Sequence, residues 1–245
     1  MPATKQTFKQ SVTDVDWTMT LMGVLALVLT WSSVSLEYAA TIATSSIHPS
    51  WGFLFAYQVG IALSALLLFN HHFHNVWATA GLLVAVCAAG GSIHHGGTAI
   101  GLLMILFPVF FILLSSRASG LQSGYGLSIY SLLASTCAPL SFIKLSTGFL
   151  SWEAVAYVIP LFLSFLFFTG PSFLQHSQWS VLIETASGLA LIIAILIRGI
   201  SLAHFLAVGV VLAGWLLVIN QKRPVDGFLA DAVAQMICVL LMYWH

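Results

Sequence analysis

Two glutamates stand inside long apolar stretches of this sequence, where a charged side chain is costly. Glu37 lies deep in the first apolar run, and Glu184 lies early in a later one. An ionisable group in hydrocarbon costs on the order of a few kcal/mol or more. A carboxyl shielded from water can also bind and release a proton near neutral pH. Both glutamates are candidates for proton or cation coupling, and the alternative is a structural bond to a neighbouring hydroxyl, such as Ser35 or Thr185.

Polar and aromatic side chains within other apolar runs would complete such a site. Trp31 and Trp215 lie deepest in their apolar runs. Each indole either lines a cavity or packs in the core, and both interpretations stay open. The candidate lining residues are Trp31, Tyr38, Gln58 and Trp215.

Histidine is the other residue type that could do chemistry here, because imidazole binds zinc, copper, iron and nickel. The nine histidines include two clusters about 20 residues apart, which corresponds to roughly 30 Å along a helix. A spanning helix would therefore place the clusters on opposite membrane faces, as two separate candidate sites for a transition metal. The alternative is that they are polar anchors at the interface. The candidate ligands are His71, His72 and His74 on one face, and His48, His94 and His95 on the other.

The composition indicates that lipid is the solvent of these residues. Charged residues make up 6% of the 245 residues and hydrophobic ones 60%, whereas soluble domains carry roughly 25% charged residues. The apolar runs are continuous, unlike the alternating segments of about ten residues in membrane barrels. The predicted fold class is an all-α, polytopic transmembrane helix bundle of about eight or nine spans in a lipid bilayer. The chain has no basic run, so nucleic acid is not an expected partner.

Turn-forming residues divide the apolar sequence into its expected spans. Residues 1–16 form a polar N-terminal segment, and residues 17–245 form one transmembrane domain. The last span holds Asp231 and Gln235, and its alternative is a helix lying in the membrane interface. The expected spans are 17–40, 51–70, 76–93, 98–116, 125–143, 152–169, 179–197, 202–220 and 227–244.

The glycine pairs Gly90-Gly91 and Gly96-Gly97 mark the segment where a helix is most expected to be irregular. Glycine permits a break in the helix, and it equally permits close helix packing. Both alternatives stay open.

Lysines and arginines at the span ends predict the orientation, because cytoplasmic loops carry an excess of them. Lys144 and Arg198 fall on one side and the other five on the N-terminal side, which predicts a cytoplasmic N-terminus in a bacterial inner membrane. No soluble catalytic domain fits between spans with such short connections. The five are Lys5, Lys9, Arg117, Lys222 and Arg223.

Two segments, 105–140 and 181–218, have the same order of features. In each, a span ends near an arginine, and a short connection leads to a second span. Repeated halves are a common plan among transporters. The chain resembles the drug/metabolite transporter superfamily, although Arg198 stands where that family carries an acidic residue. The resemblance implies transport of a small solute by a helical bundle. It rests on Trp31-Ser32-Ser33, Pro49, Pro108, and the closing pair of spans with Gly209 and Gly214.

Three functions remain open at this point. The leading expectation is a transporter for a small solute, coupled to protons or a cation through Glu37 and Glu184. The second is a membrane subunit of a metal- or quinone-dependent redox complex, with a histidine cluster as ligand set. The third is a non-catalytic subunit that anchors partner subunits, which fits the small extramembrane mass.

Overall fold

The computed structural model describes residues 15–41, 51–70, 73, 75–116, 119–174, 180–219 and 228–244. These residues form helices and no strand, which confirms the predicted all-α bundle. Seven helical stretches in the described residues are long and apolar enough to cross a membrane, counting α7 with α8 as one. Two shorter apolar helices, α10 and α11, complete the bundle.

The helix ends agree with the predicted spans to within a few residues, because apolar runs and turn residues are local signals. The exception is the sixth predicted span, which is two helices. The bounds are α2 Trp17–Thr41, α3 Trp51–Asn70, α4 Val76–Gly96, α5 Thr98–Ser115, α6 Gly124–Thr147, α7 Trp152–Tyr157, α8 Ile159–Phe173, α9 Ser180–Arg198, α10 Leu202–Ile219 and α11 Phe228–Tyr243.

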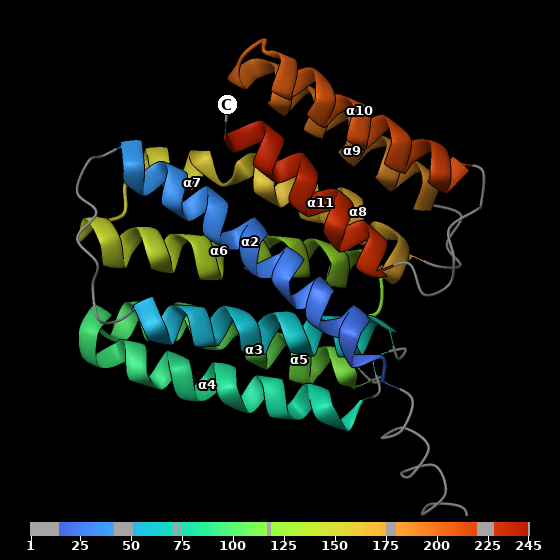
Figure 1. The fold of residues 1–245 in the computed structure, drawn as a ribbon. Coiled ribbons are helices and arrows are strands. Elements are labelled where there is room, and N and C mark those ends of the chain that lie inside the picture. The colour runs from blue at the N-terminus through green and yellow to red at the C-terminus, as the bar shows by residue number, and fades with distance from the viewer. Residues whose placement is uncertain are drawn as a thin grey trace, which may run out of the picture.

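The helices are stacked in layers (Figure 1). Helices α3, α4 and α5 lie at one side of the bundle, α2 and α6 cross its middle, and α8 and α11 follow. Helices α9 and α10 form the layer on the other side, packed on α8 and α11. The last helix, α11, packs along the first described one, α2. It is therefore a member of the bundle with a buried face, and it is one of the two helices shorter than the seven candidate spans.

Small residues let α3 and α4 approach closely. A Cβ added at Gly81 would lie 2.7 Å from the carbonyl oxygen of Gly60 and 2.5 Å from Oγ of Ser64. The same hydroxyl donates to the carbonyl oxygens of Gly60 and Ala78, at 2.8 and 2.9 Å. Backbone contact of this kind replaces the hydrophobic driving force that helices lack inside a bilayer.

The glycine-rich end of α4 stays helical through Gly90 and Gly91 as far as Gly96. Gly97, whose φ is 84°, caps this end and separates α4 from α5. A further break, inside the sixth predicted span, falls at Val158, between α7 and α8. Pro160, two residues later, has no N–H to donate to the preceding turn, which interrupts the helix.

Candidate functional site

Glu37 lies near the end of α2 and directly precedes Tyr38, which belongs to a group of three tyrosines and an arginine. Arg198 places its guanidinium carbon 4.5 Å from the ring centre of Tyr157 and 4.1 Å from that of Tyr243. Tyr38 packs against Tyr157, with ring centres 5.1 Å apart and the ring planes tilted by 60°. We call Tyr38, Tyr157, Arg198 and Tyr243 the tyrosine–arginine cluster.

The cluster fastens the ends of four helices to one another. Tyr157 is the last residue of α7 and Tyr243 the last of α11, and their rings are 5.1 Å apart. Arg198 ends α9, and its half-buried guanidinium covers both rings. A cation over one aromatic face contributes about 0.5–2 kcal/mol, more where water is excluded. This end of the bundle is therefore held by contacts among side chains from α2, α7, α9 and α11.

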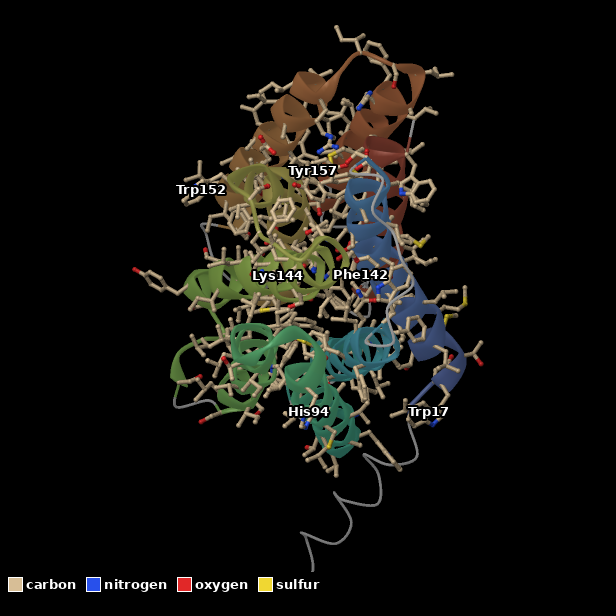
Figure 2. The ribbon with its side chains drawn as sticks, turned by 90° about the vertical axis from the view of Figure 1, so that its left-hand side faces the viewer. Trp17, His94, Phe142, Lys144, Trp152 and Tyr157 are labelled. Carbon is tan, nitrogen blue, oxygen red and sulfur yellow. The ribbon has the colours of Figure 1, made fainter. Side chains whose placement is uncertain are left out.

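The short helix α7 is attached at both of its ends. Ser151 caps its start, because its Oγ accepts from the backbone N–H of Ala154 at 3.2 Å. The Tyr38 hydroxyl lies 3.1 Å from the same Oγ. At the other end, the Tyr243 hydroxyl donates to the carbonyl oxygen of Tyr157 at 2.7 Å. Figure 2 views this end of the molecule, with Tyr157 among the helices and Trp152 at the edge.

A closed aromatic layer lies deeper in the bundle than the cluster. Trp31 stacks on Phe165 with ring centres 6.1 Å apart, and it meets Phe107 edge-on at 6.5 Å. Tyr130 contacts both phenylalanines, and all four side chains are fully buried. The structure therefore places Trp31 in a packed layer in the middle of the bundle.

Gln58 is buried and lies next to this layer. Its Oε1 accepts a hydrogen bond from the Ser32 hydroxyl at 3.0 Å, which links α3 to α2. Of the predicted lining residues, Trp31 and Gln58 thus lie deep between α2 and α3, and Tyr38 belongs to the tyrosine–arginine cluster. The three occupy successive depths along α2 and α3.

Glu184 is buried on α9 at the opposite end of the bundle from the cluster. It precedes Arg198 by 14 residues, the difference between 198 and 184, which is about 21 Å along a helix. A Cβ added at Gly170 on α8 would lie 3.3 Å from Glu184 Cγ, so the carboxylate stem fills the space that this glycine leaves. The two candidate glutamates therefore occupy opposite ends and do not form one site.

Trp215 lies at the periphery, between α9 and α10. Its indole N–H donates to the Thr185 hydroxyl at 3.1 Å. Both residues line an apolar cavity of about 170 Å³, and the exposed side chains of Leu189 and Leu212 also line it. Trp215 does line a cavity, as its candidate role requires, but this cavity belongs to the α9–α10 layer. The other lining residues are Gly188, Ile192 and Val211.

The histidine clusters fall mostly outside the described residues. His94 is exposed in the last turn of α4, and Figure 2 shows it far from Tyr157. In the described part of the chain, no group of three or more histidine, cysteine or acidic side chains could hold a metal ion. The residues His48, His71, His72 and His74, and the side chain of His95, lie outside the described residues.

His204 is the buried histidine of the described helices. It is 1% exposed near the start of α10, where its Nδ1 lies 2.7 Å from the Ser201 hydroxyl. The backbone N–H of His204 also donates to that hydroxyl at 3.3 Å, so the pair forms a local cap of α10.

Sequence reasoning missed Tyr157 and Tyr243, and it read Arg198 only as a marker of orientation. Pro160 was the available signal, because a proline within an expected span predicts a kink with exposed backbone groups. The chain matches no protein-family model, and no curated protein and no solved structure is detectably similar to it.

Proposed function

We propose that the protein is a membrane transporter for a small solute, coupled to protons or to a cation through Glu37 and Glu184. One observation carries the proposal: two acidic side chains lie at opposite ends of a single bundle, with a packed aromatic layer at intermediate depth. An ionisable residue inside a membrane domain marks a solute or proton pathway more often than a structural role.

The arrangement places each acid nearer to one side of the membrane than to the other. The layer formed by Trp31, Phe107, Tyr130 and Phe165 closes the middle of the bundle in this conformation. A solute would have to displace this layer to pass from one glutamate to the other, which is the behaviour of a carrier with alternating access. The resemblance to the drug/metabolite transporter superfamily supports the same function.

The proposal includes an orientation. Lys144 and Arg198 end α6 and α9 at the same end of the bundle, the end that holds the tyrosine–arginine cluster. With the N-terminus in the cytoplasm of a bacterial cell, the cluster and Glu37 face the outside and Glu184 lies toward the cytoplasm. Lys144 also donates to the carbonyl oxygen of Gly148 at 2.6 Å, so it caps α6 as well as marking the interface.

Reconstituted protein tests the function. Liposomes that contain the protein and the pH dye pyranine are exposed to a panel of amines, amino acids, sugars and organic acids. We expect at least one class to change the internal pH, and Glu37→Gln and Glu184→Gln each to abolish that change. Glu153→Gln is the control, because Glu153 is an exposed acid in the first turn of α7. Full coupled uptake in both test variants would show that neither glutamate takes part in coupling.

A further inference from the structure

We propose that α7 is the movable gate at the cluster end of the transporter, and that the Tyr243 hydroxyl is the latch that holds it shut. The role of α7 as a gate rests on the proposed function, whereas the bond between Tyr243 and α7 does not depend on it. It concerns six residues, Trp152–Tyr157, that are joined to α8 through the break at Val158.

The break leaves backbone groups without partners inside either helix. Tyr157 ends α7, so its carbonyl lies in the last turn. No N–H group of the same helix is available to donate to a carbonyl in that turn. Leu161 is the third residue of α8, so its N–H belongs to the first turn, whose N–H groups also lack intrahelical partners. Val158 provides no side-chain cap, and Pro160 has no N–H.

The Tyr243 hydroxyl supplies a partner on the α7 side of the break. It donates to the Tyr157 carbonyl oxygen at 2.7 Å. In an unbroken helix this carbonyl of residue i would accept from the amide of residue i+4, which is Leu161. A side chain from α11 is thus inserted into the hydrogen-bond ladder, a recognised cause of a helix kink.

Besides the burial of Ala154 in the core, α7 is held by further side-chain contacts that can be exchanged. Tyr38 reaches the capping hydroxyl of Ser151, and Arg198 stacks on Tyr157. Releasing these contacts breaks no backbone hydrogen bond within a helix. α7 can then rotate about Val158 as a short rigid unit. Such a rotation would move Tyr157 away from Tyr38 and would open the surroundings of the preceding residue on α2, the half-buried Glu37.

Hydrogen exchange of the full-length protein in lipid nanodiscs tests the latch. In Tyr243→Phe, which retains the ring next to Arg198, we expect the peptide covering residues 152–161 to exchange about tenfold faster, because the hydrogen bond that holds the end of α7 to α11 is lost. Tyr157→Phe is the matched control. The Tyr157 hydroxyl has no hydrogen-bond partner within the described residues, so its removal leaves exchange at the wild-type rate.

The pattern of exchange separates a latch from general destabilisation. A local latch accelerates exchange in residues 152–161 and leaves α11 and the rest of α8 unchanged. Equal exchange in Tyr243→Phe and Tyr157→Phe, or faster exchange throughout the bundle, would overturn the inference. If Tyr243→Phe does not fold, Tyr38→Phe releases the other end of α7. Faster exchange at Ala154 alone then supports the gate, and an unchanged rate opposes it.

The latch and the transporter can fail separately. If wild-type protein moves none of the panel solutes but Tyr243→Phe loosens residues 152–161, the latch stands and the transport proposal falls. If the wild type transports and Tyr243→Phe leaves exchange unchanged, the function stands and α7 is not its gate.

Discussion

The side-chain amide of Gln235 donates to the hydroxyl of Ser164 at 3.1 Å, and this bond joins α11 to α8 inside the bundle. Ser164 in turn donates to the carbonyl oxygen of Leu161 at 2.8 Å, so its hydroxyl is both donor and acceptor. Both side chains are almost completely buried. The pair lies about two turns deeper than the bond between Tyr243 and Tyr157, and it fixes the register of α11 against α8.

Removal of this hydroxyl should weaken the bundle measurably. Ser164→Ala leaves the Gln235 amide without its acceptor, and we expect the free energy of unfolding to fall by about 0.6–2 kcal/mol. The free energy of unfolding is measured for each variant in mixed micelles with increasing amounts of a denaturing detergent. Ser141→Ala is the control, because its buried hydroxyl has no partner among the described residues. A similar loss in both variants would show that the bond does not stabilise the bundle.

The close approach of α3 and α4 predicts a strong asymmetry between two glycines of one helix. Gly81→Ala forces a methyl group against backbone and should cost about 1–3 kcal/mol. Gly90→Ala should leave stability unchanged or slightly raised, because no atom lies within 4 Å of its added Cβ. Thermal inactivation of the two purified variants provides the comparison. A Gly81→Ala protein as stable as wild type would mean that α3 and α4 can separate at no cost.

The stacking of Arg198 on two rings predicts a measurable coupling energy. In a double-mutant cycle of Arg198→Lys with Tyr157→Leu, the unfolding free energies should be non-additive by about 0.5–2 kcal/mol. Lysine retains the charge but loses the planar guanidinium, so the cycle isolates stacking from net charge. Additive effects would indicate that Arg198 contributes only through its charge.

Cysteine labelling tests the proposed orientation. Cysteines at Ser119, between α5 and α6, and at Phe149, between α6 and α7, fall at opposite ends of α6. In a background with Cys87, Cys137 and Cys238 changed to alanine, a membrane-impermeant maleimide added to intact cells should label Phe149→Cys and spare Ser119→Cys. The reverse pattern would place the N-terminus outside.

The peripheral cavity predicts a difference between two tryptophans. Trp215 borders the apolar cavity that opens between α9 and α10, whereas Trp31 is 0% exposed. Brominated acyl chains should therefore quench the emission of Trp215 and leave that of Trp31 unchanged. Trp215→Phe should remove a quenchable component of the fluorescence in nanodiscs, and Trp31→Phe should remove an unquenched one. Equal quenchable losses would contradict the placement of α9 and α10 at the surface of the bundle.

The helices could be predicted from sequence because their signals are local, as the match of the predicted span 51–70 with α3 shows. The separation of the two glutamates could also be predicted from the sequence. Glu37 is late in the first span and Glu184 is early in the seventh, and these spans run in the same direction. The tyrosine–arginine cluster could not be predicted from the sequence, because its four residues, Tyr38, Tyr157, Arg198 and Tyr243, come from distant segments. Their meeting depends on how α2, α7, α9 and α11 pack.

The packing of α11 against α2 has a consequence for biosynthesis. Of the described helices, α2 leaves the ribosome first and its partner α11 leaves it last. Until α11 has been made, α2 lacks the neighbour that buries part of its surface, and the hydroxyl of Tyr243 is not present to hold the end of α7. The described bundle can therefore close only after α11 has been synthesised, and a chain without the final turn of α11 would be inserted but open.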